Sequence, residues 1–144
     1  MSTFKYISQL ANSQRRFIDS MATSKTYSGA QGKVIHYLFN NTDKPTYQKD
    51  IEKVFGLRAS TATELMRTLE SQDLIRRVPN AKDARFKEIL LTEKAEEYRK
   101  DVFLDMEKLE SVLTEGIGQK ELAAWIKVTC KMLDNLERGM KNEK

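Results

Sequence analysis

Short hydroxyl and charged side chains gather on the polar face of one predicted helix in the middle of the chain. They are Arg58, Ser60, Thr61, Thr63, Glu64 and Arg67. The major groove of double-stranded DNA accepts an α-helix, and hydroxyls there reach phosphates or base edges, while Arg67 can bond bidentately to guanine. A structural use is equally open, because Ser60 or Thr61 can cap the helix, and Thr61 and Glu64 have the spacing of a capping box.

A second group of charges lies at the tip of a predicted β-hairpin, in the stretch Lys82-Asp83-Ala84-Arg85-Phe86-Lys87. An arginine on a projecting loop can enter the minor groove of DNA, where narrow A·T-rich segments concentrate negative potential. Phosphates would repel Asp83, so we expect its carboxylate to hold Arg85, or a neighbouring backbone amide, in one orientation. The alternative is a solvated surface ion pair that contributes little energy.

The distribution of charge favours a polyanionic partner. The 144 residues carry a formal net charge of +4, and residues 58–87 alone hold seven cationic against four acidic side chains, a net +3. Arg77 is counted among the candidate DNA contacts with Lys82, Arg85 and Lys87 of the hairpin. Most of the excess charge therefore lies in about one fifth of the chain, as a surface that binds phosphates requires.

Apolar spacing and turn residues predict the elements that position these groups. Helices are expected over residues 4–21, 28–39, 46–56, 58–72, 92–114 and 119–140, and β-strands over 74–78 and 86–91. Ser28 and Gln31 form a predicted capping box, Thr46 and Thr92 are expected to cap later helices, and Gly56 is a helix stop. The helices on either side of Gly56 have the order of a helix-turn-helix, followed by a hairpin, or wing.

Composition excludes several classes of protein. One histidine and one cysteine rule out repeated His/Cys clusters, and the chain has no glycine-rich phosphate loop, so we expect no catalysis, no metal and no other cofactor. Cys130 cannot form a disulfide within the chain, and no charged-then-apolar signal segment opens the sequence. Charged residues interrupt every apolar run before the roughly 20 positions that a membrane helix needs. We expect a soluble, cytoplasmic protein without membrane contact.

The order of the elements resembles the MarR family of bacterial regulators over nearly the whole chain. The most specific stretches are Ser60-Thr61-Ala62-Thr63-Glu64-Leu65-Met66-Arg67-Thr68-Leu69-Glu70, Leu74-Ile75-Arg76-Arg77, Asp83-Ala84-Arg85 and Leu91-Thr92-Glu93-Lys94. The resemblance implies a mainly α fold with a small β-hairpin wing, a winged helix-turn-helix whose terminal helices form a dimerisation region. It makes residues 1–144 a single MarR-like domain, with the DNA-binding lobe at 28–92 and dimerisation helices at 1–24 and 93–144. It further implies that the helix at 58–72 is the recognition helix and that Asp83 and Arg85 are the wing's Asp-x-Arg pair.

Two positions depart from the common pattern of that family. Asp73 stands where glycine usually follows the recognition helix, and aspartate tolerates the left-handed backbone conformation. Glu64 stands where many relatives carry a basic residue, so it lowers the attraction for phosphates and can instead accept a hydrogen bond from cytosine. The operator of a relative therefore cannot be copied to this chain.

The terminal helices carry apolar stripes that need burial. Their members include Phe4, Ile7, Leu10, Trp125, Met132, Leu136 and Met140. A second copy of the chain is the natural cover, although such stripes are also ordinary core within one chain. A homodimer with two-fold symmetry would set two recognition helices about one helical turn apart, which predicts a pseudo-palindromic operator in double-stranded DNA.

The resemblance implies a transcriptional repressor that a small ligand or another signal releases. It places a pocket for a small aromatic or anionic effector between the dimer helices and the DNA-binding lobe, where Arg16 and His36 can meet an anion. A single histidine on a helix is more often a structural group. Cys130 is expected to be buried and inert rather than an oxidant sensor. The alternative function is a winged helix that contacts other proteins without specific DNA binding.

Overall fold

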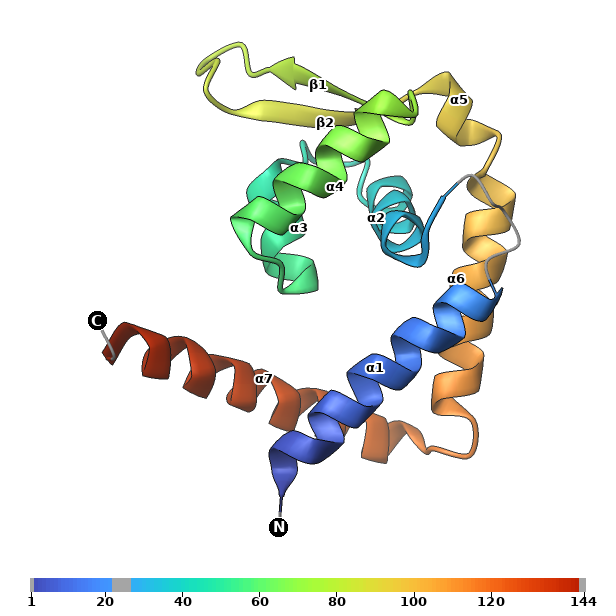
Figure 1. Cartoon of the computed structure of the whole chain (residues 1–144), viewed down its shortest axis with the longest axis vertical. Helices are drawn as coiled ribbons and strands as arrows, with labels where there is room; N and C mark the ends of the chain where they lie inside the picture. The colour runs from blue at the N-terminus through green and yellow to red at the C-terminus, as the bar shows by residue number, and fades with distance from the viewer. Residues whose placement is uncertain (1, 22–26, 143–144) are drawn as a thin grey trace. The chain divides into compact units, whose positions relative to one another are not determined.

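The computed structural model describes residues 2–21 and 27–142, whose course Figure 1 shows. The elements are α1 (Thr3–Met21), α2 (Gly29–Asn40), α3 (Gln48–Phe55), α4 (Ala59–Ser71), β1 (Ile75–Pro79), β2 (Lys87–Leu91), α5 (Glu93–Glu96), α6 (Arg99–Thr114) and α7 (Gln119–Asn142). The chain divides into two compact units: one ends at Leu109, within α6, and the other begins at Glu110 and contains α7. The predicted mainly helical fold with one small antiparallel hairpin is confirmed.

The second helix begins at the predicted capping box. Ser28 Oγ accepts a hydrogen bond from the backbone N–H of Gln31 at 3.2 Å, and the Gln31 side chain accepts one from the Ser28 N–H at 2.9 Å. The helix buries the apolar residues expected of it, Val34, Ile35, Leu38 and Phe39. A Cβ at Gly29 would overlap Cγ2 of Ile18, the buried residue of α1, so α1 and α2 approach closely at this glycine.

The start of α3 corrects one prediction. The carbonyl of an N-cap residue accepts the first hydrogen bond of its helix. The Thr46 carbonyl instead accepts from the Ile89 N–H of β2 at 2.8 Å, so Thr46 does not cap this helix. Tyr47 takes the N-cap position instead, and its N–H donates to the carboxylate of Asp50 at 2.8 Å. The helix ends at the predicted stop, Gly56, whose left-handed φ of 63° costs a glycine little.

The helix α4 follows after a short turn. Its N-cap is Arg58, without a side-chain capping bond, so neither Ser60 nor Thr61 serves as the cap that the alternative interpretation required. Ala62, Met66 and Leu69 are buried, and this spacing of three and four residues is that of one helical face. Asp73 adopts the expected left-handed conformation, with a φ of 59°, after the helix end.

The wing is an antiparallel pair of strands whose register runs from Ile75 opposite Leu91 to Pro79 opposite Lys87. Its base belongs to the core, since Ile75 and Ile89 are both buried. These two residues join a continuous apolar cluster drawn from α2 to α6, with Val34, Ile35, Ile51, Met66, Leu69, Leu74, Ala95 and Val102 among its members. The core therefore fixes the wing's base to the helix-turn-helix.

The helices after the wing differ from the single helix predicted over residues 92–114. Thr92 caps α5 as expected, with its hydroxyl accepting from the Ala95 N–H at 3.2 Å, but α5 ends at Glu96 and α6 begins at Arg99. In the second unit, α7 contains no buried residue. Cys130 of this helix is exposed, so the expectation of a buried thiol is wrong for the single chain.

Candidate nucleic-acid interface

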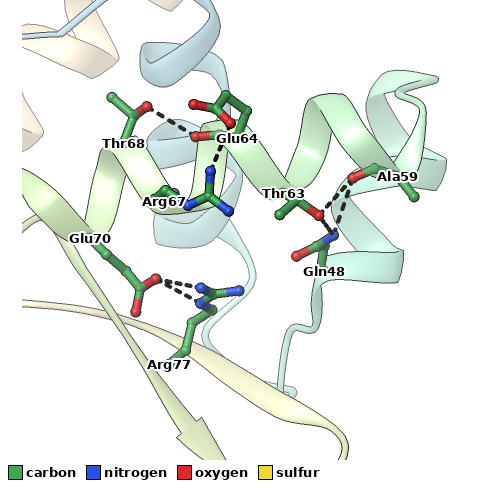
Figure 2. Close-up of polar contacts among 8 residues, drawn as sticks. All are labelled: Gln48, Ala59, Thr63, Glu64, Arg67, Thr68, Glu70 and Arg77. Atoms are coloured by element: carbon green, nitrogen blue, oxygen red, sulfur yellow. Dashed lines mark hydrogen bonds and ion pairs between the residues drawn. The ribbon is translucent and has the colours of Figure 1, made fainter.

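The polar face of α4 carries most of the predicted base-reading residues. Ser60, Thr63, Glu64 and Arg67 fall at the spacing of three, four and seven residues that brings side chains to one helical face. Ser60, Glu64 and Arg67 are exposed and Thr63 is half-buried, as is Gln48 of α3, which lies beside it. Figure 2 shows these contacts from α3 to β1.

The hydroxyl of Thr63 is held from two sides. It donates a hydrogen bond to the Ala59 carbonyl at 2.8 Å and accepts one from Gln48 Nε2 at 2.9 Å. The same Nε2 lies 3.3 Å from a carboxylate oxygen of Glu52. Gln48 therefore links the two helices of the turn motif, and it is a residue that our sequence analysis did not single out.

Glu64 and Arg67 form an ion pair on this face. Arg67 Nη1 donates to Glu64 Oε2 at 3.0 Å, and the two side chains are 67% and 71% exposed, in that order. A pair with this exposure contributes little to stability, so both groups can rearrange around a ligand at small cost. The geometry leaves further N–H donors on the guanidinium, because the bond to Glu64 uses one nitrogen only.

Thr61 and Arg58 lie apart from that stripe. Thr61 lines an open groove together with Leu65, against residues of α1 and α2. Arg58 is exposed at the start of α4. The structure thus brings Ser60, Thr63, Glu64 and Arg67 together and directs Thr61 toward another surface.

Arg77 binds within the protein. From β1 it donates through Nε and Nη2 to one carboxylate oxygen of Glu70 on α4, at 2.9 and 2.6 Å, and its side chain is 25% exposed. Figure 2 shows this bond crossing from the strand to the helix. The contact joins the wing to α4, and a DNA contact by Arg77 stays a prediction.

The wing tip shows the expected Asp83–Arg85 arrangement. Arg85 Nε and Nη2 donate to the two carboxylate oxygens of Asp83 at 3.0 and 2.7 Å, and the backbone N–H of Arg85 also donates to Asp83, at 3.1 Å. These hydrogen bonds lower the pKa of Asp83 below its usual value and raise the pKa of Arg85. Arg85 is 86% exposed, so the guanidinium is oriented and remains open to a ligand, with Lys82 and Lys87 exposed on either side.

Asn80 builds the tip and ties it to α3. Its Oδ1 accepts from the backbone N–H groups of Lys82 and Asp83 at 2.7 and 3.3 Å, while its Nδ2 donates to the Tyr47 hydroxyl at 2.7 Å. Asn80 is a residue that our sequence analysis did not single out. The sequence carries no local signal for this pair, because the two residues are 33 positions apart and Thr46 is the better capping residue by type.

The two candidate effector residues lie in different surroundings. His36 packs against the Phe103 ring with centroids 4.8 Å apart, and burial is the main cause that lowers its pKa, partly offset by the charge of Glu107. Arg16 is exposed on α1 and donates to Ser13 Oγ at 3.2 Å. Neither residue lines the groove that contains Thr61.

Two other basic residues, Arg15 and Lys33, line that groove, whose volume is about 480 Å³. Lys33 Nζ donates to Gln14 Oε1 at 2.8 Å, and burial together with the charge of Arg15 lowers the pKa of Lys33. The apolar part of the lining comes from Ala11, Ile18, Val34, Phe55, Leu57 and Leu65. The groove therefore combines apolar surface with two basic side chains and one acidic side chain, that of Asp19.

Within residues 2–21 and 27–142, no group of His, Cys, Asp or Glu is arranged to hold a metal ion. No helix in these residues has the length and hydrophobicity needed to cross a membrane.

The chain is similar to known transcription regulators. The model described as "MarR family" matches residues 33–87, from α2 to the start of β2. Among solved structures, the transcription regulator MarR from Oenococcus oeni PSU-1 has 28% identity and a TM-score of 0.81, over 90% of this chain and 97% of that one. The transcriptional regulator PA3341 has 28% identity and a TM-score of 0.76, over 93% and 97% of the two chains. The S. aureus MepR–DNA complex, at 22% identity, shares the fold with a TM-score of 0.81, over 94% of this chain and 96% of that one.

Proposed function

The chain belongs to the MarR family, whose members are transcription regulators and not enzymes, and we propose that it binds double-stranded DNA sequence-specifically through α4 and the wing. The solved complex of MepR with DNA supports this proposal by showing that a protein of the same fold binds DNA. A regulator must share a compartment with the DNA that it controls, so we also propose a cytoplasmic location.

One observation carries the proposal: side-chain hydrogen bonds join the wing to the helix-turn-helix. Arg77 of β1 bonds Glu70 of α4, and Asn80 of the tip bonds Tyr47 at the start of α3. Arg67 belongs to α4 and Arg85 to the wing, the elements joined in this way, and their side chains are 67% and 86% exposed. Because these bonds fix the distance between α4 and the wing, α4 can lie in the major groove while the wing enters the minor groove.

Exposed cations around this surface supply the attraction for phosphates. Arg58, Lys82 and Lys87 are exposed, and no carboxylate in the described part of the chain forms an ion pair with them. Binding of such residues to DNA releases counterions, so the affinity must fall as salt is added.

Two copies of the chain pair through their terminal helices in this proposal. On α1, Phe4, Ile7 and Leu10 are 68%, 51% and 46% exposed. On α7, the exposed apolar residues include Trp125, Ile126, Leu133, Leu136 and Met140. Apolar stripes of this length on a monomer are a liability unless another molecule covers them. A symmetric pair places two α4 helices on one duplex, which favours a pseudo-palindromic operator.

Regulation in this proposal is repression that a small ligand relieves, with the groove of Arg15 and Lys33 as the candidate ligand site. Its apolar lining suits a small aromatic compound, and its two basic side chains outnumber its one carboxylate, that of Asp19, which favours an anion. Thr61 and Leu65 of α4 are part of the lining, so a ligand there contacts the helix that reads DNA. Release follows only if the ligand has a higher affinity for a conformation that does not bind DNA.

The test begins with selection of genomic fragments that bind the purified protein, followed by titration of one fragment and a random duplex at several salt concentrations. We expect a steep salt dependence and weaker binding by Arg85→Ala. Arg67→Ala should weaken the selected site by about 1 to 3 kcal/mol and the random duplex little. Arg138→Ala, which removes the same charge from α7, is the control and should bind as the wild type does.

Screening small aromatic acids for release of the fragment then tests the ligand.

The second candidate function is a winged helix that contacts proteins only, and the three paired arginines favour it, since each of Arg67, Arg77 and Arg85 already has a carboxylate partner. Indifference to every duplex at low salt would support that function and remove the DNA proposal.

A further inference from the structure

The polar face of α4 presents hydrogen-bond acceptors as well as donors to a ligand. A glutamate carboxylate when ionised can only accept hydrogen bonds. Glu64 is 71% exposed at the centre of the stripe that also contains Thr63 and Arg67. A phosphate presents acceptors only, so Glu64 has nothing to offer the DNA backbone and can bond only to a donor on a base edge.

The hydroxyl of Thr63 has the same restriction because of its bonds inside the protein. Its hydrogen is committed to the Ala59 carbonyl, and Gln48 Nε2 occupies one of its acceptor positions. The orientation of the Gln48 amide is fixed by chemistry, since the Glu52 carboxylate and the Ala59 carbonyl around it are both acceptors and require the nitrogen on that side. Thr63 is left with an acceptor position and without a free donor.

Arg67 complements this acceptor group. Its ion pair with Glu64, 3.0 Å long, places a fork of N–H donors directly beside the carboxylate. In the major groove, guanine presents two acceptors, O6 and N7, whereas cytosine and adenine each present an amino group. A donor fork next to an acceptor therefore matches a guanine next to an amino-bearing base.

We propose that Glu64 and Arg67 read DNA as one unit, in which Arg67 selects guanine and Glu64 requires a cytosine or adenine amino group beside it. This inference rests on the proposed function and adds the class of operator: each half-site contains a guanine whose neighbour in the groove carries an amino group. Glu64 is then a specificity-determining residue that lowers overall affinity, because its charge repels phosphates whatever the sequence.

Two effects of opposite sign distinguish this role from a structural one. Glu64→Ala removes the repulsion, so binding to random duplex should tighten about 3-fold. It also removes the acceptor, so the preference for an amino-bearing base at one position of each half-site should fall about 10-fold. The preference for guanine at the neighbouring position should remain, since Arg67 is still present.

The experiment selects duplexes from a randomised library with the full-length wild type, Glu64→Ala, Glu64→Gln and the control Glu97→Ala. Glu97 is exposed and lies outside the proposed interface. Glu97→Ala therefore changes the net charge by the same amount as Glu64→Ala without touching the proposed contacts to DNA. Glu64→Gln can donate as well as accept, so we expect it to admit other bases at the affected position. Thermal unfolding of each variant checks that the fold is intact.

The outcomes separate the inference from the function beneath it. A wild type that enriches no sequence contradicts the proposed function itself. If the wild type enriches a motif and both Glu64→Ala and Glu64→Gln enrich the same one, the proposed function stands. The inference that Glu64 and Arg67 read DNA as one unit is then wrong. Loss of base preference at one position in both variants, with Glu97→Ala unchanged, supports it.

Discussion

The Tyr47 hydroxyl and the Asn80 side chain lie 2.7 Å apart, joined by a hydrogen bond from Asn80 Nδ2 between the start of α3 and the wing tip. The Tyr47 ring also packs edge-on against Phe86, with centroids 6.4 Å apart. A tyrosine at an N-cap forgoes the side-chain cap that serine or aspartate would supply. Its hydroxyl instead holds the residue around which the wing tip is built.

Tyr47→Phe should weaken DNA binding through the wing. The change keeps the ring and removes the hydroxyl, leaving the Asn80 amide without this acceptor, and we expect a loss of about 1 kcal/mol in binding to the selected site. The measurement is a double-mutant cycle with Arg85→Ala, titrated on one duplex. Because Tyr47 acts through the wing, the second change should cost less in the Tyr47→Phe background. Strict additivity would show that the hydroxyl does not position Arg85.

Arg77 should matter for stability because it ties β1 to α4. Arg77→Ala removes the half-buried ion pair, whereas Glu70→Gln removes the charge of the acceptor and keeps an amide oxygen that can accept from Arg77. Arg77→Ala should lower the free energy of unfolding by about 1 kcal/mol, the size of a hydrogen bond to a partly exposed charged group, and Glu70→Gln should lower it by less. Urea denaturation measures the change. Lys87→Ala, which removes an exposed cation from the paired strand, serves as the control. If Arg77→Ala alters DNA affinity and leaves unfolding unchanged, the residue contacts DNA and the tie to Glu70 contributes nothing.

Short sequence patterns were sufficient to predict those parts of the site that are formed by residues close together in the chain. Gly56 ends α3, the Asp83–Arg85 pair is two residues apart, and apolar spacing places Met66 inward and Arg67 outward on α4. These features depend on helix geometry and turn chemistry, which a short window of sequence contains.

Contacts between distant segments could not be predicted in the same way. The Tyr47–Asn80 bond spans 33 residues and the Gln48–Thr63 bond spans 15. Thr46 is a better capping residue than Tyr47, yet the bond from its carbonyl to Ile89 of β2 moves the start of α3 by one residue. Tertiary pairing outweighs capping preference there. The break between α5 and α6 leaves no mark on the apolar spacing, which continues through it.

Asp83 should titrate at lower pH in the wild type than in Arg85→Ala. The hydrogen bonds from Arg85 lower the pKa of Asp83 in the folded state, so this pair favours folding above the unfolded pKa of about 3.9, and that contribution disappears as the pH falls through the folded pKa. Carboxyl-carbon NMR shifts followed against pH give the value for each protein. Equal pKa values in the two proteins would mean that the pair does not persist in solution, and Arg85 would then be unoriented before it meets DNA.

Leu136→Glu should separate the proposed dimer. Leu136 is 61% exposed on α7, and a carboxylate there cannot be buried against a second apolar face without a large desolvation penalty. Lys127→Glu is the matched control, because it lies nine residues earlier, on the opposite face of the same helix, and also introduces a carboxylate. Sedimentation equilibrium should give twice the chain mass of 16.7 kDa for the wild type and the control, and the single mass for Leu136→Glu. The monomeric variant should retain its helical circular dichroism and lose most of its affinity for a two-half-site duplex, since each copy then binds one half-site alone. A wild type that sediments as a monomer at micromolar concentration would show that another molecule covers this face.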